Sequence, residues 1–169
     1  MTSRTLGNVS IEELRKRFES TRWRQFLSNF FGNDYMMWHD GYDPDAILNL
    51  TDEEKQVAEE MLLKSIPLNG MWSAAGLALL RSQKAVAVMK EQFARTHTNL
   101  VKIRLADAIM QIIRGEEYIP VLIGCLQNAA FWSDRAEAAR ELRKYPLPGV
   151  IQALFIMLFS TIFERTSRK

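Results

Sequence analysis

Cysteine, histidine, glycine and proline are all scarce in this sequence, and each shortage excludes a class of structure. The single cysteine, Cys125, cannot form a disulfide bond within the chain. Because its neighbours are aliphatic, we interpret it as a buried core residue rather than a reactive thiol. The two histidines, His39 and His97, are far apart and have no cysteine beside them, so we expect no metal site and no cofactor. With only eight glycines and five prolines among 169 residues, long helices with short connections are favoured over a sheet.

The motifs that identify common enzymes are also missing. The sequence contains no nucleotide-binding glycine pattern, no G-x-S-x-G nucleophile motif and no H-E-x-x-H metal motif. The acid-rich segment 40–45 lacks the alternating oxygen ligands and the closing glutamate of a calcium loop. We therefore expect a protein that is not an enzyme. Residues 1–8 lack the apolar core of a secretory signal, which leads us to expect a cytoplasmic protein.

The segment 147–163 is apolar enough to raise the question of a membrane. It contains no charged residue, but Pro148 and Gly149 open it, and polar residues interrupt it at Gln152, Ser160 and Thr161. We therefore predict a last helix that is buried against its neighbours, and no membrane association. A tail anchor and an interface helix are the two alternatives.

Apolar residues recur at helical spacing along most of the chain, which predicts an all-α protein. Capping boxes predict two helix starts, one at Ser10 and one at Thr51. The first of these helices is expected to continue through an aromatic face to Phe31, and an irregular linker over 35–49 is expected after it. Further helices are predicted over 72–80, 84–95, 100–113, 119–126, 134–144 and 147–163.

A period of 31 residues relates three of these helices. The matched segments are rich in small residues and are each followed by a more aliphatic helix: they are 73–77, 104–108 and 135–139. Two-helix units at such a period indicate a solenoid, in which stacking buries the apolar surface that one hairpin leaves exposed. We expect a single domain, with a cap and linker over 1–50, about three to four hairpins over 51–163 and a polar tail over 164–169.

The repeat resembles HEAT-like helical repeats of the short bacterial type over residues 51–163. The resemblance rests on the Arg-x-Ala-x-Ala helix start at Arg135, on its looser counterpart at Arg104, and on the Ile119-Pro120 start of another helix. It implies an all-α fold, a short α-solenoid of stacked antiparallel helix pairs with an N-terminal capping helix. It also implies a small bacterial immunity or adaptor protein that binds a partner protein.

Two groups of residues are candidates for partner binding. The first has the aromatic and acidic composition of a surface that faces a basic partner: Tyr35, Trp38, Asp40, Tyr42, Asp43 and Asp45. Plain packing is the alternative for its aromatic members. The second is a polar stripe on the helix 100–113, together with an arginine of the next repeat that we expect to form an ion pair between repeats: Arg104, Asp107, Gln111, Arg114 and Arg135. The stripe fits either hydrogen bonds between repeats or a concave polar binding surface.

A non-enzymatic protein–protein interaction module is therefore the leading hypothesis. The alternative is a HEAT-like nucleic-acid-binding protein related to the alkylpurine DNA glycosylases, whose candidate contacts would be Arg15, Arg17, Arg22 and Arg24 beside Trp23. The acidic segment 40–60 would repel phosphate, which counts against this alternative. A third possibility, an enzyme of the phycobilin-lyase type, requires a bilin pocket that the sequence does not identify.

Overall fold

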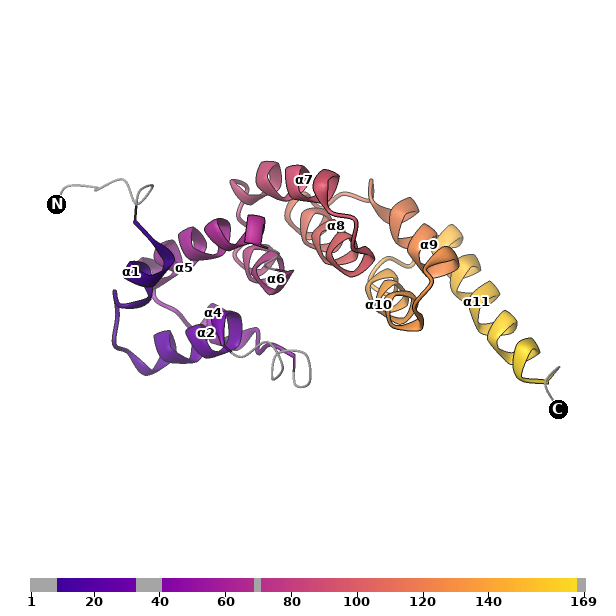
Figure 1. Cartoon of the computed structure of the whole chain (residues 1–169), viewed down its shortest axis with the longest axis horizontal. Coiled ribbons are helices and arrows are strands. Elements are labelled where there is room, and N and C mark those ends of the chain that lie inside the picture. Colours follow the sequence, from indigo (N-terminus) through magenta and orange to yellow (C-terminus); the bar gives the residue numbers. More distant parts are fainter. Residues whose placement is uncertain (1–8, 33–40, 69–70, 167–169) are drawn as a thin grey trace. The chain divides into compact units, whose positions relative to one another are not determined.

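Every element of the described chain is a helix. The computed structural model describes residues 9–32, 41–68 and 71–166, and these ranges contain ten α-helices and one short 3₁₀ helix but no strand. The prediction of an all-α protein is therefore confirmed. The contacts divide the chain into two compact units, residues 1–92 and 93–169, and the boundary falls inside α7 (Ala85–Arg95). Figure 1 shows the helices of both units.

The first unit is built around the capped helix α5. Its elements are α1 (Ile11–Arg15), α2 (Thr21–Phe31), α4 (Asp45–Leu48), α5 (Asp52–Ser65), the 3₁₀ helix η2 (Ile66–Leu68), α6 (Met71–Leu79) and most of α7. Both predicted capping boxes are present, because Ser10 and Thr51 each exchange hydrogen bonds with the glutamate three residues later. The buried apolar side chains of α5 lie on one face of the helix: Val57, Ala58, Met61 and Leu62.

The predicted first helix is in fact two helices, α1 and α2, so the prediction of a continuous helix is wrong. A second N-cap explains the break, since the Ser20 hydroxyl accepts a hydrogen bond from the backbone N–H of Trp23 at 3.1 Å. The indole Nε1 of Trp23 donates to the carbonyl oxygen of Arg15 at 2.9 Å, which satisfies the end of α1. The predicted linker over 35–49 is also not wholly irregular, because it contains the single-turn helix α4.

Aromatic rings fill the core of the first unit. Trp23, Phe26 and Phe30 follow one another along the buried face of α2, at ring-centroid distances of 5.0 and 5.4 Å. The helix α6 contacts both α2 and α5. At Gly76 it lies close to both helices, since a Cβ atom there would be 2.9 Å from side-chain atoms of both Leu62 and Phe30. A larger residue at this position would therefore push α6 away from the aromatic face.

The second unit contains α8 (Asn99–Ile113), α9 (Ile119–Asn128), α10 (Trp132–Leu142) and α11 (Pro148–Thr166). Within it, α8 and α9 each contact α10, α8 contacts α9, and α9 contacts α11. Pro120 lies in the first turn of α9, as predicted. A helix was predicted over 134–144, but α10 begins two residues earlier, at Trp132, with Phe131 in the N-cap position.

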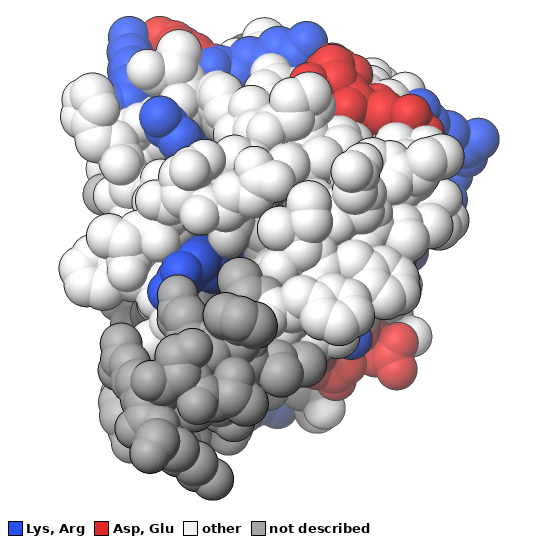
Figure 2. All heavy atoms as spheres, turned by 90° about the vertical axis from the view of Figure 1, so that its right-hand side faces the viewer, with Lys and Arg blue, Asp and Glu red and all other residues white. Residues whose placement is uncertain are grey.

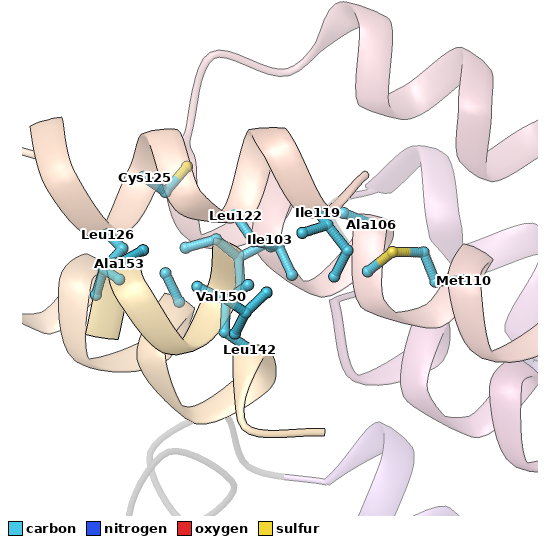
Figure 3. Packing of buried hydrophobic residues seen from close by; sticks show 11 residues of the cluster. Ile103, Ala106, Met110, Ile119, Leu122, Cys125, Leu126, Leu142, Val150 and Ala153 are labelled. Atoms are coloured by element: carbon cyan, nitrogen blue, oxygen red, sulfur yellow. The ribbon is translucent and has the colours of Figure 1, made fainter. Parts of the chain in front are cut away.

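Side chains from all four helices meet in one apolar core of the second unit (Figure 3). Members from successive helices include Ile103, Met110, Leu122, Leu126, Leu142, Val150 and Ala153. Cys125 belongs to this core, and burial followed by the charge of Asp134 raises the pKa of its thiol. The prediction that Cys125 is a core residue is confirmed.

Candidate functional site

The polar stripe predicted on α8 lies against α10, where its arginine meets two buried glutamates. The Nη2 atom of Arg104 lies 2.6 Å from Glu137 Oε1, and its Nη1 atom lies 3.5 Å from Glu141 Oε1. The other oxygen of Glu137, Oε2, forms an ion pair with Arg140, whose Nη1 atom lies 2.9 Å away. Arg104 therefore joins α8 to two successive turns of α10.

A second part of the same stripe centres on Asp107. Its Oδ2 atom accepts hydrogen bonds from Lys144 Nζ at 2.8 Å and from Gln111 Nε2 at 2.5 Å. Its Oδ1 atom accepts one from the hydroxyl of Tyr145 at 3.2 Å. Lys144 also forms an ion pair with Glu141, so the two parts are connected. Together these residues form what we term the charged network, with three carboxylates and three cations: Arg104, Asp107, Glu137, Arg140, Glu141 and Lys144.

Burial and crowding move the pKa values of these carboxyls in different directions. Burial, followed by the charge of Glu141, raises the pKa of Asp107. Burial also raises the pKa of Glu137, although Arg104 and Arg140 oppose the rise. For Glu141, burial raises the pKa, but the hydrogen bond and charge of Lys144 together with Arg104 outweigh it, so its pKa is lowered. All three carboxyls thus depend on the cations beside them.

Not every predicted member of this group joins the charged network. Arg114 is instead the exposed C-cap residue of α8, with a left-handed backbone at φ 55°. Arg135 is half-buried, and the ion pair predicted for it is not formed with any described residue. The physical reason is helical geometry. Glu137 lies on the side of α10 that faces α8, and Arg135, two positions earlier, lies nearly on the opposite side. The arginine that meets α10 is Arg104, one repeat earlier.

The aromatic and acidic group is only partly described. Three of its members lie outside the described residues: Tyr35, Trp38 and Asp40. Tyr42 is half-buried, and its ring centroid lies 5.5 Å from that of Phe30 and 6.0 Å from that of Trp72. Asp43 and Asp45 are exposed, and Asp43 Oδ1 accepts the backbone N–H of Asp45 at 2.9 Å. Tyr42 is therefore a packing residue, and the two aspartates form a local turn.

The arginines proposed for a nucleic-acid surface are divided between structural and exposed positions. The Nη2 atom of Arg15 donates to a backbone carbonyl at the end of α2 at 2.7 Å. The Nε atom of Arg22 donates to the buried carboxylate of Glu54 at 2.6 Å. Arg17 and Arg24 are exposed. Two of the four candidates are thus already used to hold the first unit together.

The last helix, α11, has a wide exposed apolar face, so the prediction that it is buried against its neighbours is wrong. Val150 and Ala153 are its buried residues among those with described burial. Five large side chains on the same helix are between 46% and 62% exposed and together form the α11 face: Ile151, Phe155, Ile156, Leu158 and Phe159. Figure 2 looks at this end of the second unit, where the visible surface is mainly uncharged.

The lengths of the helices explain this exposure. Helix α11 has 19 residues, whereas α9, which it contacts, has 10. At 1.5 Å per residue, α11 is about 28 Å long and α9 about 15 Å, so α9 can cover only part of it. In Figure 1, α11 runs well past the end of α9. The other helices of this unit therefore cover one side of the first turns of α11, and among the residues up to Phe159 they leave the α11 face exposed.

The exposed residues of α11 line up along the helix rather than being scattered. Ile151, Phe155 and Phe159 follow one another at intervals of four, which places them on one stripe. The rings of Phe155 and Phe159 stack at a centroid distance of 6.2 Å. Two more aromatic residues of the second unit, Phe131 and Trp132, are exposed at the start of α10. No helix within the described ranges is both long enough and apolar enough to cross a bilayer.

Sequence reasoning missed several of these residues. The signal for Glu137 and Glu141 was present, since two glutamates at a spacing of four in an alanine-rich helix share one face. Lys144 and Tyr145 gave no such signal, because they follow the end of α10 and reach Asp107 only through the fold. The α11 face was visible as an uncharged helix, but whether neighbours cover such a helix is not encoded locally.

Comparisons with protein-family models, with curated proteins and with solved structures found no match to this chain. The two features that remain as guides to function are therefore the charged network and the α11 face. The members of the charged network form ion pairs with one another. The α11 face is open to solvent and contains no charge.

Proposed function

We propose that this chain is a non-enzymatic protein–protein interaction module that docks its partner on the α11 face. The observation that carries the proposal is the exposure of five large apolar side chains on one helix. A helix that is apolar on nearly all sides is stable in water only when something covers it. Contiguous apolar surface of this kind is typical of binding sites, whereas single exposed apolar residues are not informative.

We further propose that the module is a short HEAT-like solenoid. In the second unit α8 contacts α10, and α9 contacts α11, so helices about one repeat apart lie against each other, as stacked hairpins require. Under this arrangement α11 would be the second helix of the last hairpin, after α10. A solenoid end needs a polar outer face or a partner, and α11 lacks the polar face.

The pairing of charges within the network favours a structural role for its carboxylates over a catalytic one. Each of its carboxylates is in contact with a cation of the same network, which is the arrangement that holds two helices in register. Within the described ranges, no three metal-binding side chains are grouped to hold an ion. An adaptor or immunity protein, as the HEAT-like resemblance implies, would need only a rigid scaffold and one docking face.

The proposal is tested by comparing proteins retained by the wild-type chain and by a double variant, Phe155→Ser with Phe159→Ser. We expect the wild-type chain to retain a protein partner in stoichiometric amount, and the double variant to lose most of it. Leu68→Ser is the matched control, because Leu68 is 73% exposed on the first unit and should leave retention unchanged. Equal retention by all three proteins, or no stoichiometric partner of any kind, would contradict the proposal.

A further inference from the structure

We infer that the partner on the α11 face is a second copy of this chain, so that two molecules pair face to face through α11. This inference rests on the proposed function, because it assigns an occupant to the same surface. In a twofold dimer each patch meets an identical patch, and residues near the axis meet their own counterparts. A charged residue near the axis would therefore meet a like charge, and self-pairing favours a face that has none.

The composition of α11 meets this requirement. The sequence carries no charged residue from Leu147 to Phe163, and Gln152 is the one polar residue between Ile151 and Phe159. Interfaces that select a different protein commonly use charged groups to exclude wrong partners. The α11 face offers no such group to a foreign partner, but it is complementary to itself.

The stripe of exposed residues also has the geometry of a helix-pairing surface. Ile151, Phe155 and Phe159 form an i, i+4, i+8 ridge that extends over about 12 Å of helix. Ridges of this type interlock with the same ridge of a second helix in the most common class of helix packing. With two copies related by a twofold axis, Phe155 would lie nearest to the axis, and Ile151 would face Phe159 of the other copy.

The area of the face is sufficient for a reversible dimer. Side chains of this size that are about half exposed each present roughly 100 Å², so the α11 face presents roughly 500 Å². Two such faces would bury about 1,000 Å² in total, which is near the lower limit for a specific interface. We therefore expect a dimer whose population depends on concentration, rather than a permanent one.

A lipid surface fits the face less well. Helices that lie in a membrane interface carry a basic polar side opposite their apolar side. In α11 the opposite side holds Val150 and Ala153, which are buried in the core of the second unit. From Leu147 to Phe163 the sequence carries no basic residue, so this part of the helix has no basic side with which to lie among lipid headgroups.

Sedimentation equilibrium of the full chain over a wide range of concentrations tests the inference. We expect the apparent mass to rise from the 19.5 kDa of one chain toward twice that value. Phe155→Glu should remain monomeric over the same range, because two buried carboxylates would meet at the axis. The matched control Leu68→Glu introduces the same charge at an exposed leucine of the first unit and should dimerise like the wild type. Far-ultraviolet circular dichroism checks that each variant keeps its helices.

A charge-reversal pair makes the test specific for self-pairing at Phe155. Phe155→Lys alone should also remain monomeric, whereas an equimolar mixture of Phe155→Lys and Phe155→Glu should form the mixed dimer. A wild-type chain that stays monomeric at concentrations approaching about 1 mM would overturn the inference. So would a mixture of the two variants that associates no better than either variant alone.

The failure of this inference can be separated from the failure of the proposed function. The chain could be monomeric and still need Phe155 and Phe159 to retain a different protein. That result would overturn the inference that the partner is a second copy and leave the docking function intact. Binding of the monomeric chain to phosphatidylcholine vesicles, lost in Phe155→Glu, would identify a lipid partner and overturn both. A monomer that binds neither protein nor vesicle would also overturn both.

Discussion

The two units of this chain bury carboxylates in opposite ways. In the first unit Glu54 is a single buried acid that accepts hydrogen bonds from Ser20 Oγ at 2.5 Å, Arg22 Nε at 2.6 Å and the backbone N–H of Thr51 at 2.9 Å. Burial raises its pKa, but these donors outweigh that effect and lower the pKa of Glu54 to about 2. In the second unit, burial and a neighbouring carboxylate raise the pKa of Asp107.

The difference shows that burial alone does not set the cost of an internal charge. Glu54 is surrounded by donors that come from two helix starts, so its ionised form is the stable one. The charged network places three acids side by side, and each depends on a particular cation to stay ionised. The first arrangement fastens α2 to α5, and the second fastens α8 to α10, but they should respond differently to mutation and to acid.

The largest effect is expected from removing the central cation of the charged network. Arg104→Ala leaves Glu137 and Glu141 without their shared partner, and we expect it to destabilise α8 and α10 by about 4 kcal/mol. Hydrogen exchange of the amides in these helices measures the loss. Arg140→Ala is the control, because Arg140 contacts the same glutamate but is 56% exposed, against 15% for Arg104. It should cost less than about 1 kcal/mol, and equal losses in the two variants would show that burial of the cation is unimportant.

A smaller effect is expected from neutralising Glu54, the buried acid of the first unit. Because the pKa of Glu54 is lowered to about 2 from an ordinary value of 4.5, Glu54→Gln should destabilise the first unit by about 3 kcal/mol at pH 7. The free energy of unfolding measured from exchange in α2 and α5 reports the loss. The difference between the variant and the wild type should shrink toward pH 2, where Glu54 itself becomes protonated. Glu53→Gln, in the same helical turn but exposed, should change little at any pH.

In the wild-type chain, a fall in pH should change the stability of the two units differently. A carboxyl with a lowered folded pKa stabilises the fold above its unfolded pKa and loses this contribution as the pH falls, so Glu54 should cost the first unit about 2 kcal/mol by pH 3. Asp107 and Glu137 have raised pKa values and act in the opposite direction, because the folded state takes up their protons first. Glu141, whose pKa is lowered, cancels part of that gain.

We therefore expect the amides of α2 and α5 to lose protection on acidification before those of α8 and α10. Native-state hydrogen exchange between pH 6 and pH 3 makes this comparison within one molecule. If the amides of the second unit lost protection first, its buried acids would respond to acid as Glu54 does. The predicted difference between the two units would then be wrong.

The smallest effect is expected at the edge of the charged network. Tyr145→Phe removes the hydroxyl that donates to Asp107 Oδ1 at 3.2 Å, and we expect it to destabilise the second unit by about 1 kcal/mol. Tyr118→Phe is the matched control, because the ring of Tyr118 packs against Phe93 at 4.9 Å and should keep that contact. Chemical denaturation of both variants provides the measurement. A loss at Tyr118 as large as that at Tyr145 would show that the hydroxyl of Tyr145 contributes nothing specific.

The parts of the fold that could be predicted are those that depend on residues a few positions apart. The capping boxes at Ser10 and Thr51 and the proline start of α9 at Pro120 involve groups within one helical turn. The break between α1 and α2 was missed because the Ser20 cap lacks the glutamate that makes a capping box recognisable. It also depends on Trp23 reaching back to Arg15.

Only the α8 side of the charged network could be predicted from the sequence. The spacing of Arg104, Asp107 and Gln111 correctly placed them on one stripe of α8, and the structure pairs that stripe with α10. Which acids and bases would face it depends on how α10 and the segment after it lie against α8. The ion pair predicted for Arg135 was wrong for this reason, since its position in the repeat does not indicate which side of α10 faces α8.

By itself, the sequence determined that this chain is helical, where several of its helices begin, and that the segment 147–163 is apolar and uncharged. Helical periodicity and capping involve residues three or four positions apart, so they can be recognised in the sequence without knowledge of the tertiary structure. Only the tertiary structure decided that α9 is too short to cover α11 and that the acids of α10 meet the stripe of α8. Both outcomes depend on which helices touch and over what length, and those contacts join residues that are distant in the chain.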